Sequence, residues 1–191
     1  MLKKSLFSML FLSALLFQGC FDGEENQTKQ VKQIDALVKN DNEYVLTSTD
    51  ARQFVVQKVQ NGLTLKEFDG KIVIFDIFAT WCPPCQASAE HLSSIQKEFK
   101  DDVVVIGLTI EDNIPNTKLE KFKSRYHANY TIVNSPENRR LINEIASQLQ
   151  LGARFPIPLM ALYKDGQLIQ HYVGAVEEEF VVSDIKQALG K

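Results

Sequence analysis

Apolar and polar residues follow one another along the chain in blocks that predict strands. Residues 71–79 and 103–110 are apolar on both alternating faces, a pattern typical of central strands covered on both sides. The pair Asp165-Gly166 separates two later apolar segments and is a strong signal for a two-residue hairpin turn. Shorter extended segments, rich in β-branched and aromatic residues, are predicted at residues 44–48, 53–59, 130–133, 159–163 and 167–173.

Between these strands, apolar residues recur with the spacing of amphipathic helices. One predicted helix opens at Ser135, its expected N-cap, and carries an apolar stripe from Leu141 to Leu149. Strands that alternate with helices, followed by a hairpin and a last helix, indicate an α/β fold with a mixed sheet in a single domain. The other predicted helices cover residues 31–38, 83–99, 118–126 and 177–189.

The amino terminus resembles a bacterial lipoprotein signal. Lys3 and Lys4 precede an apolar run from Leu6 to Phe17, which is too short to span a bilayer. Cys20 follows Gly19 at the end of this region and is the candidate lipidation site, although Phe17 stands where that motif prefers Leu. The alternative is a signal removed by an ordinary peptidase, with Cys20 incidental. We therefore predict a signal peptide (1–19), a lipidated tether and lead-in (20–42), and one domain (43–191).

Composition narrows the function classes. The chain has 191 residues, of which 45% are hydrophobic and 24% charged, so it can form a globular core and is not a disordered chain. Its formal net charge of −3 argues against a nucleic-acid partner, which calls for a basic face. With three Cys, the chain is not a small disulfide-stapled scaffold.

The most informative motif is Cys82-Pro83-Pro84-Cys85, between a predicted buried strand and a predicted helix. A helix amino terminus stabilises a thiolate, so Cys82 is expected to be the exposed, activated thiol, with Cys85 able to close a disulfide with it. Alternatives are a structural disulfide or half of a zinc site. Zinc needs four ligands, and no second Cys pair or paired His spacing exists, so no metal is expected.

Asp76 is the single charged residue among residues 72–79 of the first buried run. An ionised carboxylate in an apolar strand is costly without a partner, so this placement suggests a role. A raised pKa would let Asp76 take and return the proton of Cys85 during thiol exchange. The alternative is an edge strand in which Asp76 simply faces water.

The run from Val73 to Cys85 resembles the active-site segment of thioredoxin-fold proteins, closest to the exported, membrane-tethered TlpA/ResA-like branch that includes cytochrome c maturation reductases. Ile157-Pro158, the Asp165-Gly166 hairpin and Val173-Gly174-Ala175 extend the match. The resemblance implies a thioredoxin-like fold: a mixed central sheet flanked by helices, a central strand-helix insertion within residues 111–150, and an N-terminal β-hairpin.

The resemblance also implies further site residues. Pro158 would follow a cis peptide bond and face the Cys pair, and the backbone of Ile157 would hydrogen-bond a client peptide; Pro156 is the rival for the cis position. Trp81 would cover the Cys pair, with a core aromatic as the alternative. Pro83 and Pro84 complete the expected substrate-binding residues.

Two departures from the family pattern affect these expectations. Thioredoxin pairs its buried Asp with a Lys on the neighbouring strand, yet residues 103–110 contain no Lys. Asp76 is therefore expected to ionise less readily. Leu159 stands where Thr commonly follows the cis proline, which would reshape the substrate groove.

These observations predict an extracytoplasmic thiol–disulfide oxidoreductase that needs no cofactor besides its Cys82–Cys85 disulfide. The resemblance favours a reductase whose clients are protein disulfides, with apocytochrome c as a candidate and a membrane thiol relay as electron source. One alternative is an oxidase that donates disulfides. A less favoured one is a copper chaperone, for which a wider Cys spacing and a His near the cis proline would be expected.

Overall fold

A computed structural model describes residues 41–191 of the chain. The predicted signal peptide, Cys20 and the predicted helix at residues 31–38 lie outside the described residues. The strands are β1 (Glu43–Thr47), β2 (Gln53–Val59), β3 (Gly62–Leu65), β4 (Ile72–Phe78), β5 (Val103–Thr109), β6 (Thr131–Val133), β7 (Leu159–Lys164) and β8 (Gln167–Val173). The helices are α2 (Pro83–Glu98), α3 (Asn116–Arg125), α4 (Asn138–Gln148) and α5 (Glu178–Ala188), with a short 3₁₀ helix η1 (Lys66–Phe68).

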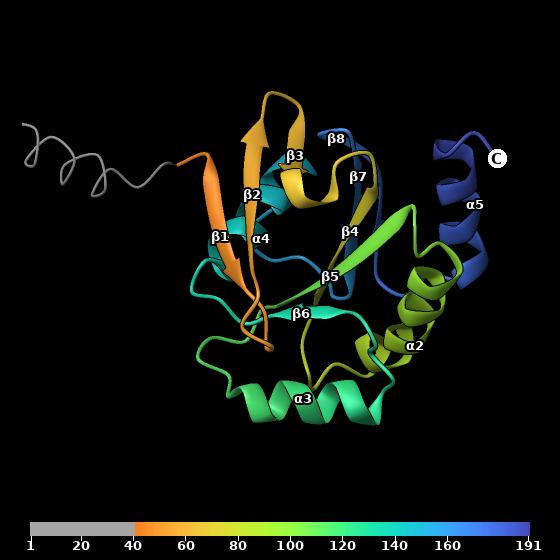
Figure 1. The fold of residues 1–191 in the computed structure, drawn as a ribbon. Coiled ribbons are helices and arrows are strands. Elements are labelled where there is room, and N and C mark those ends of the chain that lie inside the picture. The colour runs from red at the N-terminus through yellow and green to blue at the C-terminus, as the bar shows by residue number, and fades with distance from the viewer. Residues whose placement is uncertain (1–40) are drawn as a thin grey trace, which may run out of the picture. The chain divides into compact units, whose positions relative to one another are not determined.

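A five-stranded mixed sheet forms the centre of the domain, in the order β6-β5-β4-β7-β8 (Figure 1). Strands β4, β5 and β6 are parallel, whereas β7 runs antiparallel to both β4 and β8. Strand β4 lies in the middle of this sheet, and all seven of its residues are buried. The prediction of a mixed sheet with a doubly covered central strand is confirmed.

Two apolar layers cover the sheet, one on each face. On one face, alternate residues of β4 and β5 pack with the apolar sides of α2, α3 and α5. On the other face, the intervening residues pack with α4 and with the N-terminal strands. This alternation follows from the pleat of a strand, which directs successive side chains to opposite faces. The segment with α3, β6 and α4 is the predicted insertion.

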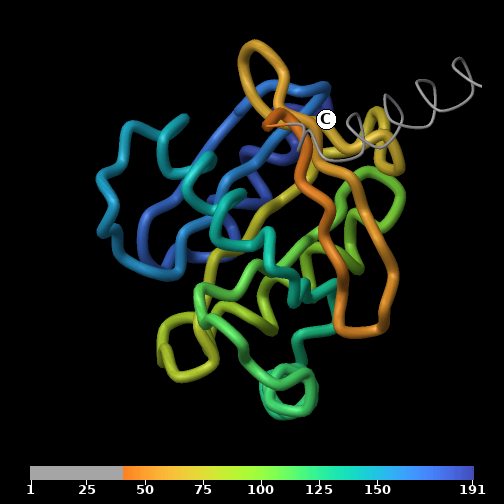
Figure 2. The backbone as a smooth tube through the Cα atoms, turned by 90° about the vertical axis from the view of Figure 1, so that its left-hand side faces the viewer, coloured from red at the N-terminus to blue at the C-terminus, as the bar shows by residue number. Residues whose placement is uncertain are grey.

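The predicted N-terminal hairpin is present and larger than expected. Strands β1 and β2 pair antiparallel, and β3 adds a third strand that the sequence analysis missed. Strand β3 has four residues and begins at Gly62, so it offered little periodicity to recognise. The far turn of the hairpin, orange in Figure 2, hydrogen-bonds to β6: Thr49 N donates to Ile132 O at 2.9 Å, and Ser48 bridges Val133. It thereby covers the β6 edge of the central sheet.

One predicted turn is confirmed, and one predicted helix cap is not. The Asp165-Gly166 turn between β7 and β8 is confirmed, with φ values of 51° and 77°, the left-handed conformations that such hairpins require. The prediction that Ser135 caps α4 is wrong, because Glu137 occupies the N-cap position and the helix begins at Asn138. The Ser135 hydroxyl instead donates to Val45 O at 3.0 Å, so it is used to hold β1.

Within residues 41–191, every helix is too short or too polar to cross a bilayer.

Candidate active site

The redox pair lies where β4 ends and α2 begins. Cys82 is the N-cap of α2, Pro83 and Pro84 fill the first two helical positions, and Cys85 is the third. Proline is tolerated there because the first N–H groups of a helix have no intrahelical acceptor. The two sulfur atoms form a disulfide, and the Cα atoms of the two cysteines lie 5.3 Å apart. The backbone N–H of Cys85 also donates a hydrogen bond to Cys82 Sγ at 3.3 Å. A thiolate on Cys82 would therefore accept from the helix amino terminus.

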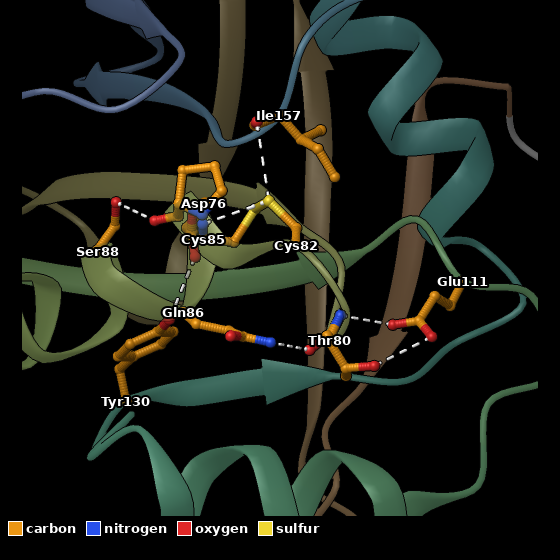
Figure 3. Close-up of a disulfide and its surroundings, with 10 residues drawn as sticks. Asp76, Thr80, Cys82, Cys85, Gln86, Ser88, Glu111, Tyr130 and Ile157 are labelled. Carbon is orange, nitrogen blue, oxygen red and sulfur yellow. Dashed lines mark hydrogen bonds between the residues drawn. A yellow bond between two sulfur atoms is a disulfide. The ribbon is translucent and has the colours of Figure 1, made fainter.

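Both cysteines are buried in this oxidised state, Cys82 at 3% and Cys85 at 2% exposure. The expectation of an exposed Cys82 is thus wrong for the disulfide form, since the bond to Cys85 directs Sγ into the protein. On the other side, Cys82 Sγ lies 3.8 Å from the carbonyl oxygen of Ile157 (Figure 3). The cis-proline loop therefore lies directly beside the sulfur of Cys82.

The loop opposite the disulfide contains a cis peptide bond. It is the Ile157–Pro158 bond, at the position implied by the family resemblance, and the Phe155–Pro156 bond is not cis. Gly174 N donates to Pro158 O at 2.8 Å, so the segment after β8 holds this loop in place. Trp81 is 62% exposed, which rules out the core-aromatic alternative and leaves its ring available at the entrance to the site.

Asp76 lies deep behind the redox pair, with 2% exposure in the middle strand of the sheet. The edge-strand alternative is therefore wrong. Asp76 shares its β4 face with Ile74 and Phe78, which pack in the cluster that contains Cys85. Burial raises the pKa of Asp76 to about 7, opposed by one hydrogen bond, from Tyr130 OH to Oδ2 at 3.2 Å. Its carboxyl can therefore change protonation state near neutral pH.

A second carboxylate, Glu111, was missed by the sequence analysis. It accepts hydrogen bonds from Thr80 N at 2.7 Å, from Thr80 Oγ1 at 3.1 Å and from Lys118 Nζ at 2.7 Å (Figure 3). Burial would raise the pKa of Glu111, but the bonds from Lys118 and Thr80 outweigh it and lower the pKa. Glu111 thus anchors the residue that precedes Trp81 and Cys82.

The sequence did hold a signal for Glu111. Phe78 and Thr109 are neighbours in the parallel β4–β5 pair, and Thr80 and Glu111 follow each of them by two residues. Polar residues just beyond the carboxyl ends of adjacent parallel strands meet at one edge of a sheet.

A groove of about 910 Å³ adjoins the redox pair. Trp81 and Ile157, which flank the disulfide, form part of its wall. The insertion supplies much of the remainder, including Glu111 and the ion pair in which Arg139 bonds both carboxylate oxygens of Asp112. Because Trp81 and Ile157 lie beside the disulfide, the groove runs past the redox pair and has room for a polypeptide segment.

The described part of the chain holds no group of side chains that could bind a metal ion together with the Cys pair. Residues 41–191 bring together no group of three or more His, Cys, Asp or Glu side chains that could hold an ion. The Cys pair is closed as a disulfide, and it would offer a soft metal its thiolate ligands only in the reduced form.

Comparison with known proteins agrees with the fold and with thiol–disulfide oxidoreductase activity. The Redoxin family model matches residues 47–189. The chain is 25% identical over 133 residues to the thiol-disulfide oxidoreductase ResA of Halalkalibacterium halodurans, covering 69% of this chain and 70% of that protein. It is 21% identical over 173 residues to ResA of Bacillus cereus, covering 90% and 85%.

Solved structures show the same fold. A thioredoxin-family thiol:disulfide interchange protein from Chlorobium tepidum superposes with a TM-score of 0.60 at 19% identity, over 78% of this chain and 94% of that one. A secreted Mycobacterium tuberculosis disulfide oxidoreductase, described as homologous to the Escherichia coli protein DsbE, superposes with a TM-score of 0.54 at 16% identity, over 78% and 99%.

A thioredoxin-like fold with a disulfide at a helix amino terminus, facing a cis-proline loop, defines a thiol–disulfide oxidoreductase. The chain belongs to the Redoxin family, and its relatives make it a TlpA/ResA-like member of the thioredoxin fold.

Proposed function

We propose that this protein is an extracytoplasmic, lipid-anchored reductase of disulfides in exported proteins. The observation that carries the proposal is the position of the Cys82–Cys85 disulfide, between the amino terminus of α2 and the carbonyl of Ile157. This position stabilises an attacking thiolate and provides a backbone acceptor beside it for an incoming polypeptide. The reaction itself needs only the Cys pair, and no cofactor.

In the first step, the thiolate of Cys82 attacks one sulfur of the client disulfide. A bond forms between Cys82 and that sulfur, the client disulfide breaks, and the other client sulfur leaves as a thiolate that takes a proton from water. Trp81, Pro83, Pro84 and Ile157 surround the attacked sulfur and position the client chain.

In the second step, Cys85 resolves the mixed disulfide. The carboxylate of Asp76 takes the proton from the Cys85 thiol, and the resulting thiolate attacks the sulfur of Cys82. The client's second sulfur leaves as a thiolate and takes the proton that Asp76 returns, so the client has gained two electrons and two protons in total. The Cys82–Cys85 disulfide is formed in exchange, and a membrane thiol relay must reduce it before the next cycle.

The direction of electron flow rests on resemblance to the TlpA/ResA-like branch, as does the candidate client, apocytochrome c. The groove beside the disulfide supports a polypeptide client, since its volume exceeds what a small thiol would fill. The secreted location named for the M. tuberculosis structure supports a place outside the cytoplasm.

Single Cys variants test this mechanism. Cys82→Ser should abolish disulfide exchange, because it removes the attacking sulfur. Cys85→Ser should accumulate mixed disulfides with client proteins, because the first step proceeds and the second cannot. Non-reducing electrophoresis followed by mass spectrometry detects these adducts. Turnover by Cys82→Ser, or adducts on Cys85 in place of Cys82, would contradict the assigned roles.

The proposed anchor is tested separately through Cys20. Cys20→Ala should move the protein from the membrane fraction to the soluble fraction, because it removes the acceptor for the lipid. Immunoblots of fractionated cells measure this, with Cys82→Ser as a control that leaves the signal intact. Persistent membrane association of Cys20→Ala would mean that another segment supplies the anchor.

A further inference from the structure

Asp76 has an asymmetric environment. Oδ2 accepts a hydrogen bond from Tyr130 OH at 3.2 Å, whereas Oδ1 is buried with no hydrogen-bond partner among the described residues. Asp76 is also the only charged side chain in residues 41–191 that is buried. A buried oxygen atom without a hydrogen-bond partner destabilises the folded protein. Such atoms are therefore most often found at functional sites, where the group takes part in the chemistry.

Tyr130 reaches Asp76 because β5 leaves room for its ring. Gly107 lies directly opposite Asp76 in the parallel β4–β5 register, and Ile132 of β6 lies next to Gly107. A Cβ atom at Gly107 would lie 3.1 Å from Cε2 of Tyr130, which is tighter than ordinary contact. The missing side chain at Gly107 therefore lets the ring of Tyr130, the residue just before β6, reach across to the middle strand.

Among the described groups on this face of the sheet, Tyr130 is the one that donates a hydrogen bond to the carboxylate of Asp76. The strand on the opposite side, β7, presents the uncharged Met160 next to Asp76. Cys82, the N-cap of α2, and Cys85 belong to the same buried cluster, and the partly buried Tyr126 and Tyr172 pack against it. Tyr172 bonds Asp184 instead, and no hydrogen bond joins Tyr126 to Asp76.

We propose that Tyr130 is a positioning residue for the proton transfer, because its phenol occupies Oδ2 of Asp76 and leaves Oδ1 to exchange a proton with Cys85. The inference rests on the proposed role of Asp76 in resolving the mixed disulfide. The phenol stabilises the carboxylate without donating a proton outright, since burial and the nearby carboxylate raise the pKa of Tyr130 well above its usual value. Gly107 is the second element of this arrangement.

The test compares Tyr130→Phe with Tyr163→Phe in the full-length protein. Tyr130→Phe keeps the ring over Gly107 and removes only the hydroxyl. Without its donor, the carboxylate is less stable, so the midpoint of Asp76 ionisation should rise by about one pH unit. Carboxyl-carbon NMR of the oxidised protein measures this midpoint. The pH dependence of mixed-disulfide resolution, measured by stopped flow, should move in the same direction.

Tyr163→Phe is the matched control. Tyr163 is buried and donates one hydrogen bond, to Gln148 at 2.9 Å, but it packs on the opposite face of the sheet. Tyr163→Phe should lose about as much folding stability as Tyr130→Phe, because each loses one buried hydrogen bond. It should leave the midpoint of Asp76 ionisation unchanged. Gly107→Ala should displace the Tyr130 ring and raise the midpoint with no change to either titrating group.

The outcomes separate this inference from the proposed function. If Asp76→Asn removes the pH dependence of resolution but Tyr130→Phe leaves the midpoint and the rate profile unchanged, Tyr130 has no positioning role and the inference is overturned. If Asp76→Asn itself leaves the pH dependence intact, the proton-transfer role of Asp76 fails and this inference fails with it. The attack by Cys82 would stand in both cases.

Discussion

Two carboxylates lie near the redox disulfide, and their surroundings give them opposite properties. Asp76 is enclosed between the sheet and α2, receives one hydrogen bond, and has a pKa raised by burial to about 7. Glu111 lies just beyond the carboxyl end of β5, receives three hydrogen bonds, and has a lowered pKa. One can exchange protons at neutral pH, while the other stays ionised.

This difference assigns the work that each group can do. A group that exchanges protons must be comparably stable in its two forms, and desolvation of Asp76 achieves that. A group that holds a loop must keep its charge, and the donors on Thr80 and Lys118 ensure it for Glu111. The same side-chain chemistry thus serves proton transfer on the inside of the site and positioning of the Cys82 loop on the outside.

The largest expected effect is on stability when the charge of Asp76 is removed. Below about pH 4, Asp76 is protonated in both the folded and the unfolded chain and carries no penalty. As pH rises to about 7, the unfolded chain loses this proton while the folded protein retains it, so stability falls. Asp76→Asn should therefore be more stable than the unsubstituted protein above pH 7, by about 4 kcal/mol at most.

Denaturant unfolding of the oxidised protein between pH 4 and pH 8 measures this difference. Asp69→Asn, at an exposed position after η1, controls for the loss of one negative charge. A constant difference between the Asp76 variant and the unsubstituted protein across this range would mean that Asp76 does not titrate in the folded state as described.

A smaller effect of opposite sign is expected for Glu111→Gln. This variant weakens the bonds to Thr80 and the ion pair with Lys118, so it should destabilise the protein by about 1–2 kcal/mol at neutral pH. The stabilisation by Glu111 is present above its unfolded pKa and is lost as pH falls through its lowered folded pKa. The loss should therefore shrink in acid, as thermal unfolding at pH 3 and pH 7 would show.

Lys118→Met separates the two contributions at Glu111, and its effect should be the smallest. The Lys118 side chain is 52% exposed, so its ion pair should contribute about 0.5 kcal/mol and weaken in high salt.

Disulfide exchange should slow in Glu111→Gln and remain near normal in Lys118→Met, because only Glu111→Gln loosens the loop at Thr80. Equal slowing in both variants would contradict the view that the Thr80 bonds position the Cys82 loop.

Much of the fold was predictable because its signals are local. The buried runs of β4 and β5, the Asp165-Gly166 turn and the start of α2 at the Cys motif depend on residues adjacent in sequence. Asp76 was identified for the same reason, since it interrupts an otherwise apolar strand.

The remaining features depend on register and tertiary contacts. Tyr130 looks like any strand aromatic until the β4–β5–β6 register places Gly107 beside Asp76. Ser135 looked like a helix cap, yet the distant Val45 carbonyl takes its hydroxyl. The burial of Cys82 depends on the distant loop at Ile157, which a local sequence pattern does not place beside it.

The most direct test of the central claim is the reduction potential of the Cys82–Cys85 pair, measured in the full-length protein by equilibration with thiol buffers. The account predicts a value near that of thioredoxin, about −270 mV, at which the reduced pair readily gives electrons to client disulfides. A value near about −120 mV, typical of a strong disulfide donor, would contradict the proposed reductase and reverse the direction of electron flow.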